Sequence, residues 1–161
     1  LQFSIKESDK LTALGADSIE LLFGANTGED LLPLHKVASG GELSRIALAF
    51  KSVFNTGNDK TLVFDEIDVG ISGDIALQVA AKIQQISRHN QVFCITHLPQ
   101  TASIADHHYH ISKREEDGRT ISSVRPLSDD EHVAQIARMM SGNSFSKTAE
   151  ETAREMIAHF K

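Results

Sequence analysis

The sequence contains little cysteine and no long apolar run, and each shortage excludes a class of protein. Cys94 is the only cysteine among the 161 residues, so no disulfide can form within the chain, as expected in a reducing cytoplasm. No apolar run approaches the roughly 20 residues that span a bilayer. Residues 1–4 lack the basic and then apolar pattern of a signal peptide. We therefore expect a soluble, cytoplasmic protein that does not enter a membrane.

A phosphate-binding loop of the form Gly-x-x-x-x-Gly-Lys-Ser/Thr is also missing. The nearest candidate, residues 57–61, precedes a strand instead of opening a helix, so it cannot cradle phosphates as a P-loop does. The first residue is Leu1 rather than a methionine, and we expect the chain to be a fragment of a longer protein. If it binds a nucleotide, another segment must hold most of the phosphates.

Size and composition predict one globular domain over residues 1–161. Hydrophobic residues make up 40% of the chain and charged residues 24%, which are ordinary values for a protein with a packed core. The net charge of −6 repels a phosphate backbone at long range. If the protein contacts nucleic acid, this piece is not expected to carry most of that contact.

Hydrophobic periodicity predicts an α/β fold. Strand-like patterns occupy residues 3–6, 19–23, 61–65, 91–96, 107–114 and 119–125. Helical patterns occupy residues 40–55, 74–87, 99–105, 129–140 and 146–160. The first two strands suggest a hairpin or meander at a sheet edge. Ser128 and Glu131 predict a capping box, and residues 55–57 and Gly142 are predicted helix stops. Cys94 lies in an apolar run and is expected to be a buried, unreactive thiol. Residues 61–96 read as a strand, a helix and a strand with short links, so the two strands should be parallel neighbours. We expect a mostly parallel sheet flanked by helices, with an antiparallel hairpin at its edge.

Two carboxylates end the strand at 61–65. Buried strands of open α/β sheets place their ligands just past their carboxyl ends, so Asp65 and Glu66 should lie at a site. Asp65 is suited to hold Mg²⁺, in part through water, and Glu66 is then free to orient and deprotonate an attacking water. Asp68 follows on the exit loop, where it could bond to a neighbour. The alternative is that these acids merely cap the next helix.

Ser39, Gly40, Gly41 and Glu42 open the helix at residues 40–55. Glycines let backbone N–H groups approach an anion, and a helix N-terminus adds partial positive charge. These features predict a phosphate-binding element. The alternative is a plain Ser39 N-cap.

Several histidines lie at or after the end of the strand at 91–96. His97 comes directly after this strand, at the edge where Asp65 and Glu66 should lie. A neutral imidazole there could donate to a phosphate oxygen. The alternative is a structural hydrogen bond. His107, His108 and His110 do not form a complete metal set, and we interpret them as surface residues.

Four motifs in this order resemble those of the ABC ATPases. Residues 37–45 resemble the signature motif, 62–66 the Walker B strand, 68–73 the D-loop and 96–100 the switch histidine. Val-Gly-Ile-Ser-Gly and Thr-His-Leu-Pro-Gln are closer to the SMC-like bacterial DNA repair members than to transporter subunits. The resemblance spans almost the whole chain and implies the C-terminal half of an ABC-type P-loop ATPase head.

The resemblance implies a role for each motif residue. Asp65 would face Mg²⁺, Glu66 the attacking water and His97 the γ-phosphate of ATP in the same head. Ser39, Gly40 and Gly41 would bind the γ-phosphate of the ATP held by the opposite head. Glu42, in the signature motif, and Asp68, in the D-loop, are also implied to belong to the nucleotide-binding residues.

The resemblance also implies partners. The missing P-loop would lie in an N-terminal half separated from this chain by a long coiled coil, and two heads would form a homodimer around two ATP molecules. The whole protein would bind DNA at the nucleoid and act in double-strand break repair, recombination and the SOS response. Two alternatives stay open: a non-catalytic tether whose ATP site only gates head pairing, and part of a transporter or other ABC subunit.

Overall fold

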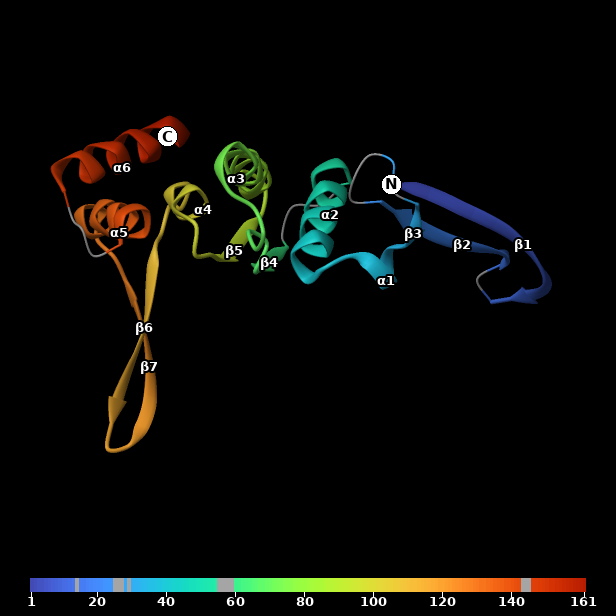
Figure 1. Cartoon of the computed structure of the whole chain (residues 1–161), viewed down its shortest axis with the longest axis horizontal. Coiled ribbons are helices and arrows are strands. Elements are labelled where there is room, and N and C mark those ends of the chain that lie inside the picture. The colour runs from blue at the N-terminus through green and yellow to red at the C-terminus, as the bar shows by residue number, and fades with distance from the viewer. Residues whose placement is uncertain (14, 25–27, 29, 55–59, 143–145) are drawn as a thin grey trace. The chain divides into compact units, whose positions relative to one another are not determined.

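The computed structural model covers residues 1–161, and the structure is described for all of them except 14, 25–27, 29, 55–59 and 143–145. The elements in chain order are β1 (Gln2–Thr12), β2 (Gly15–Phe23), β3 (Leu32–Pro33), α1 (Leu34–Val37), α2 (Gly40–Val53), β4 (Thr61–Asp65), α3 (Gly73–Ser87), β5 (Gln91–Ile95), α4 (Pro99–Ser103), β6 (Tyr109–Glu116), β7 (Arg119–Pro126), α5 (Asp129–Ser141) and α6 (Lys147–Phe160) (Figure 1).

The chain divides into two compact units, residues Leu1–Leu43 and Ser44–Lys161. Each unit is described by itself. The expectation of a single domain over residues 1–161 stays a prediction.

The first unit is built on an antiparallel sheet with the strand order β1-β2-β3. The predicted hairpin at the start of the chain is confirmed, and Ile5 lies opposite Ile19 across its two strands. Opposite residues share a face of the sheet, so Phe3 lies on the same face as this pair. All three side chains are at least 60% exposed, so the apolar face of the hairpin is open.

Helix α2 begins where the two glycines predicted it. It starts at Gly40 and its last residue is Val53, so it runs from the first unit into the second. The predicted stop at residues 55–57 lies outside the described part of the chain. Leu48, on the third turn, is 3% exposed and belongs to the core of the second unit.

The second unit contains the predicted strand-helix-strand element. Strands β4 and β5 are parallel, with Phe64 opposite Cys94 and Asp65 opposite Ile95. Helix α3 connects them and buries one face against this sheet. The core here is apolar and consists of Leu48, Phe64, Ile67, Val79, Ile83 and Ile86.

The other face of the β4–β5 pair is open and apolar. Val63, Phe93 and Ile95 point away from α3 and are 63%, 49% and 51% exposed. Side chains alternate between the faces of a strand, so both faces of this pair carry apolar residues, as in a sheet that is covered on both sides.

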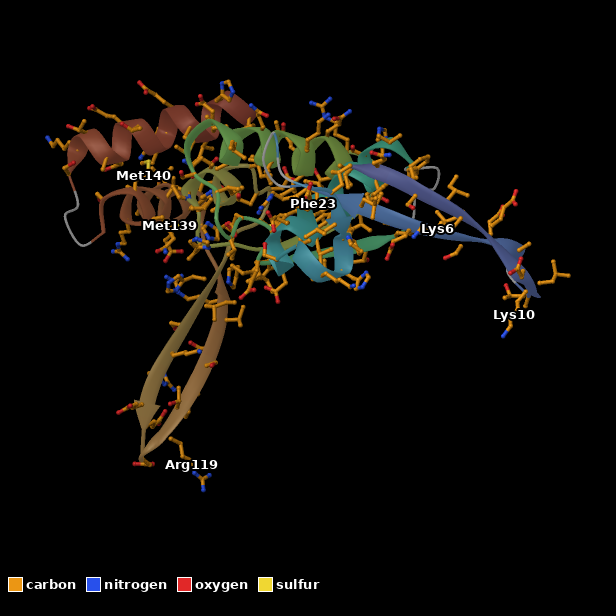
Figure 2. The ribbon with its side chains drawn as sticks, turned by 45° about the vertical axis from the view of Figure 1, so that its right-hand side comes forward. Lys6, Lys10, Phe23, Arg119, Met139 and Met140 are labelled. Carbon is orange, nitrogen blue, oxygen red and sulfur yellow. The ribbon has the colours of Figure 1, made fainter. Side chains whose placement is uncertain are left out.

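The expectation of one mostly parallel sheet is wrong for the described residues. These form three separate sheets, of which only β4–β5 is parallel, and the β6–β7 hairpin is a sheet of its own and not an edge of the parallel one. Every residue of β7 is exposed, and the outer half of β6 carries Lys113, Arg114, Glu115 and Glu116. Both faces of this outer half of the hairpin carry charged side chains, and burying either face against a sheet would remove those charges from water at a cost in free energy. Arg119 lies at its tip (Figure 2).

The last three helices pack together around a second apolar core. It consists of Ala102, Val133, Ile136, Ala137, Ala153 and Ile157. The predicted capping box at the start of α5 is confirmed: Ser128 accepts from the N–H of Glu131, and the Glu131 carboxylate accepts from the N–H of Ser128. That N–H and the Arg125 side chain hold the pKa of Glu131 below its ordinary value. The predicted stop at Gly142 is also confirmed, since its φ of 64° suits glycine.

The interpretation of His108 as a surface residue is wrong. Its ring meets that of His132 edge to face, with 4.9 Å between ring centres, and its Nδ1 atom is buried without a hydrogen-bond partner in the described part of the chain. Burial, helped by the nearby His132, lowers the pKa of His108 to about 4. Burial also lowers the pKa of His132. These two histidines join the base of the hairpin to α5.

Among the described residues, no helix combines the length and the apolar composition needed to cross a bilayer.

Candidate functional site

The C-terminal edge of the β4–β5 pair gathers the acidic and histidine motifs of the second unit. Because Asp65 lies opposite Ile95 in a parallel ladder, the next residues of both strands leave the sheet at the same edge. Glu66 therefore follows β4 beside the place where Thr96 and His97 follow β5. The expectation that both motifs share one edge is confirmed.

Asp65 and Glu66 both face solvent. Within the described part of the chain, neither carboxylate has a hydrogen-bond or ion-pair partner. Glu66 has a φ of 54°, in the left-handed region that an L-residue other than glycine seldom adopts. Such backbone strain is found most often at functional sites. The two carboxylates are therefore available to a ligand and are not helix caps.

These carboxylates fit a magnesium ion that is held mainly by water and phosphate. Mg²⁺ keeps several waters and binds through one or two carboxylates together with substrate phosphates. The described residues contain no group of three or more His, Cys, Asp or Glu that could hold a metal by itself. Asp65, exposed at a strand end, is a residue of the type that such a site uses.

Asp68 is turned into the protein. It is fully buried, and its Oδ2 atom accepts a hydrogen bond from the Thr96 hydroxyl. Its Oδ1 atom lies 3.4 Å from Nδ1 of His97, whose side chain is 66% exposed. The Thr96 oxygen in turn accepts from the N–H of Leu98, at 3.0 Å. Asp68 therefore joins the loop after β4 to the turn after β5.

Arg45 holds the same loop from helix α2. Its Nη1 atom donates to the backbone oxygen of Ile67 at 3.2 Å and to that of Val69 at 2.9 Å. These two carbonyls flank Asp68. A guanidinium carries several donors in a fixed plane, so one side chain fixes the backbone on both sides of the buried acid.

Ser39 and Glu42 form a reciprocal cap at the start of α2. The N–H and the hydroxyl of Ser39 both donate to Oε2 of Glu42 at 2.8 Å, and the N–H of Glu42 donates to the Ser39 oxygen at 3.3 Å. The N-cap alternative is therefore correct for the isolated helix. It does not exclude phosphate binding, because Ser39 and Gly40 are exposed and a Cβ atom on Gly40 would meet no atom within 4 Å.

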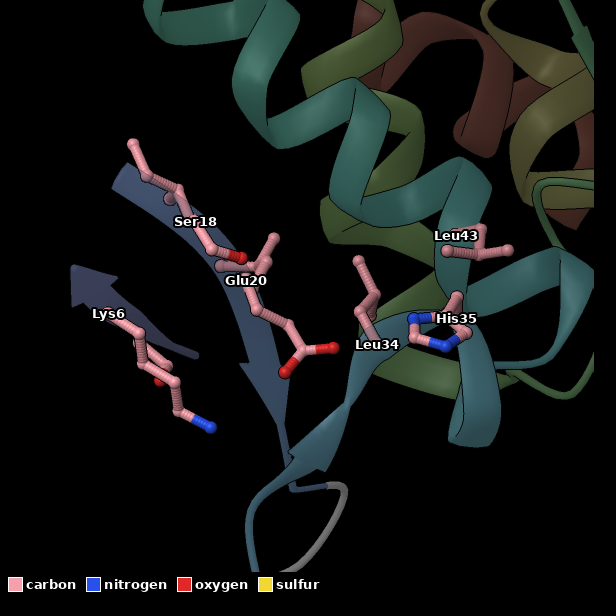
Figure 3. Close-up of a pocket in the computed structure, with 9 residues that line it drawn as sticks. Lys6, Ser18, Glu20, Leu34, His35 and Leu43 are labelled. Atoms are coloured by element: carbon pink, nitrogen blue, oxygen red, sulfur yellow. The ribbon is translucent and has the colours of Figure 1, made fainter. Parts of the chain in front are cut away.

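A cavity of about 490 Å³ lies in the first unit, among side chains of β1, β2, α1 and α2. Lys6, Glu20 and His35 supply its charged and titratable groups, and Leu34 and Leu43 supply apolar walls (Figure 3). None of the motif residues expected to contact ATP or Mg²⁺ lines this cavity.

Cys94 takes no part in the chemistry of this edge. It packs against the core, and burial raises the pKa of its thiol to about 12. The thiolate is the reactive form of cysteine, so the expectation of an inert thiol agrees with its surroundings.

Among solved structures, the fold matches that of an SMC ATPase. A structure from work on ATP-driven dimerization and DNA-stimulated activation of SMC ATPases aligns with a TM-score of 0.51 and 24% identity, over 89% of this chain and 83% of that chain. The fold is therefore of the SMC ATPase class. No protein-family model matches the chain.

Sequence comparison identifies the relatives within that class. The DNA repair protein RecN of Bacillus subtilis strain 168 is 48% identical over 149 residues, which are 92% of this chain and 26% of that protein. RecN of Halalkalibacterium halodurans is 47% identical over 89% of this chain and 26% of its own length. RecN of Deinococcus radiodurans is 46% identical over 98% of this chain and 28% of its own length.

By sequence the chain is related to the RecN DNA repair proteins. The resemblance to the SMC-like bacterial DNA repair proteins is thereby confirmed. The chain spans about a quarter of the length of these relatives.

The sequence analysis missed two contributors to this edge. Arg45 lies in the stretch that resembles the signature motif, and its position three residues after Glu42 gave no sign of the contact with Ile67 and Val69. Thr96 was noted only as the neighbour of His97. In both cases the partner lies more than 20 residues away along the chain, so no local pattern could reveal it.

Proposed function

We propose that this chain is the C-terminal half of the ATP-hydrolysing head of a RecN-like protein that acts in DNA double-strand break repair. The observation that carries this proposal is that Asp65, Glu66 and His97 all follow β4 and β5 at the same edge of the sheet. Among the described residues, neither carboxylate has a hydrogen-bond or ion-pair partner. The relation to RecN supports the choice of ATP as the ligand at that edge.

Three residues at this edge have separate roles in the hydrolysis of ATP. Asp65 holds the metal, and Mg²⁺ when bound neutralises charge on the β- and γ-phosphates. Glu66 orients a water molecule and accepts its proton. The water oxygen then bonds to the γ-phosphorus, and the bond between that phosphorus and the bridging oxygen of the β-phosphate breaks. His97 contacts an oxygen of the departing phosphate, where a hydrogen-bond donor stabilises developing charge.

The start of α2 serves the ATP molecule of a second head. When a phosphate approaches, the Ser39 hydroxyl and the N–H groups of Gly40 and Gly41 donate to it, and the helix N-terminus adds favourable charge. Each hydrogen bond to a charged group contributes about 1.5–3 kcal/mol. Several such bonds formed together favour pairing of ATP-bound heads, with Glu42 and the loop around Asp68 completing the motifs at the interface.

The complete protein supplies what this chain lacks. An N-terminal half with a P-loop grips the phosphates, and we propose that it also covers the apolar face formed by Val63, Phe93 and Ile95. DNA binds to the whole protein, which places it at the nucleoid in the cytoplasm. This chain by itself is expected to hydrolyse ATP weakly or not at all.

The transporter alternative is not favoured, because the relatives named above are DNA repair proteins. The non-catalytic tether differs from the proposed ATPase in one measurable respect. In the full-length protein, Glu66→Gln should abolish ATP turnover and preserve ATP-dependent head pairing, because the amide cannot take a proton but keeps the shape of the side chain. Turnover that is unchanged in this variant would remove Glu66 from its role, and negligible turnover in the wild type would favour the tether.

A further inference from the structure

We propose that Asp68 is a positioning residue for His97: its buried carboxylate accepts the Nδ1–H of the imidazole and thereby directs Nε2 toward the nucleotide. The inference rests on the proposed role of His97 at the γ-phosphate. It assigns Asp68 a task inside its own head, whereas the resemblance implied that Asp68 belongs to the nucleotide-binding motifs.

The burial of Asp68 requires a partner for each of its oxygens. A carboxylate removed from water loses several kcal/mol of solvation unless it is hydrogen-bonded or paired. The Thr96 hydroxyl satisfies Oδ2. Oδ1 is buried and has no hydrogen-bond partner within the described part of the chain, and Nδ1 of His97 lies 3.4 Å from it. A small turn of the exposed ring is enough to complete this bond.

The backbone around Asp68 is held in place for this purpose. Arg45 binds the carbonyls of Ile67 and Val69 on either side of it. On the histidine side, the N–H of Leu98 donates to the Thr96 oxygen, which fixes the hydroxyl that bonds to Asp68. The acid is therefore rigid while the imidazole, which is 66% exposed, can still turn. The acid sets the orientation of the ring and not the reverse.

This contact decides which ring nitrogen faces the site. A histidine that gives its Nδ1–H to a carboxylate presents Nε2 to the ligand. Donation from Nε2 to a phosphate oxygen then requires a ring that carries hydrogen on both nitrogens.

The test is a double-mutant cycle in the full-length protein, with ATP turnover, the KM for ATP and ATP-dependent head pairing measured for each variant. Asp68→Asn keeps the size of the side chain and its acceptor for Thr96, but turns an amide N–H toward His97. We expect kcat to fall about 10–100-fold, the range found when a residue that orients a metal-ligating histidine is removed, with little change in KM. In the His97→Gln background the same substitution should have no further effect.

If Asp68 only stabilises the loop, Asp68→Asn should lower kcat equally with and without His97. That result, or an Asp68→Asn variant with wild-type kcat, would overturn the proposal.

A second measurement separates this inference from the proposed function. In the full-length protein with ¹⁵N-labelled histidine, the His97 signals are assigned by their loss in His97→Gln. They should report hydrogen on Nδ1 in the wild type and on Nε2 in Asp68→Asn. If His97→Gln leaves turnover intact, the proposed role of His97 fails, yet the ring signals still decide whether Asp68 orients it. Identical His97 ring signals in wild type and Asp68→Asn would overturn the positioning role.

Discussion

The hydroxyl of Ser39 and the carboxylate of Glu42 are joined by a hydrogen bond of 2.8 Å across the first turn of α2. This bond, with the two backbone bonds beside it, occupies the polar groups of Ser39 with Glu42. A phosphate that approaches this turn has to replace Glu42 as the partner of Ser39, so the strength of the cap and the binding of the phosphate are opposed. Substitutions at Ser39 therefore have two effects, one on folding and one on head pairing.

Ser39→Ala should weaken both. Loss of a serine N-cap costs about 0.5–2 kcal/mol of stability, and loss of the hydroxyl removes one donor to the phosphate of the opposite head. Ser146→Ala is the matched control, since Ser146 caps α6 through a bond from the N–H of Ala149. Both variants should lose a similar free energy of unfolding, measured in denaturant, but only Ser39→Ala should weaken ATP-dependent pairing in a sedimentation experiment. Equal pairing in the two variants would separate Ser39 from the interface.

Gly40→Ala should affect pairing without harming the fold. Gly40 is the first residue of α2, it is not among the glycines with positive φ, and an added Cβ meets nothing within 4 Å. Alanine is also the better helix former by up to about 1 kcal/mol. The unfolding free energy should therefore stay constant or rise, while the methyl group obstructs a phosphate and lowers ATP-dependent pairing severalfold. Undiminished pairing would show that no anion approaches Gly40 closely.

Arg45→Met should destabilise the second unit. The substitution keeps much of the side-chain length but removes two donors to the carbonyls of Ile67 and Val69, and hydrogen bonds from a charged group contribute about 1.5–3 kcal/mol each. We expect a loss of at least about 2 kcal/mol in chemical unfolding. The control is Arg154→Met, because Arg154 forms exposed ion pairs with Glu150 and Asp130, which contribute at most about 1 kcal/mol. A larger loss at Arg154 than at Arg45 would contradict this assignment.

Stability should fall in acid because of His108. Burial lowers its pKa from 6.5 to about 4, so as the pH falls below about 6.5 the unfolded chain takes up a proton that the folded chain refuses. The stabilising contribution of the neutral ring is fully present above pH 6.5, declines between pH 6.5 and 4, and does not change further below that. Thermal unfolding as a function of pH measures this decline.

His108→Gln should flatten the decline, while His107→Gln, at an exposed neighbour, should leave its slope unchanged. If both variants kept the full decline, the contact between His108 and His132 would not be its source.

The sequence predicted the elements of the second unit well because their signals are local. The unbroken apolar runs of β4 and β5, the helical spacing of α3 and the Ser128–Glu131 capping box are signals that lie within the elements they predict. The parallel pairing followed from the short links of a strand-helix-strand unit. Glu66 and His97 were placed correctly for the same reason, since both sit where a strand ends.

Features that depend on distant partners could not be predicted. Asp68 has the sequence context of an exposed loop acid, and the partner of its buried Oδ2 atom, the Thr96 hydroxyl, lies 28 residues away along the chain. His108 precedes a strand whose other residues are mostly exposed, and α5 supplies the ring that covers it. The pairings within each hairpin and within the strand-helix-strand unit were predicted from the sequence. No local pattern shows whether these groups join, so one sheet was expected where the described residues form three.

The bare side of the β4–β5 pair has a consequence in the cell. A solvent-exposed surface of valine, phenylalanine and isoleucine is a target for chaperones and proteases, and it promotes aggregation of incompletely folded chains. Any copy in which this surface remains uncovered is therefore short-lived. Quality control in the cell would in this way favour copies whose apolar face is covered, whether or not they have bound ATP.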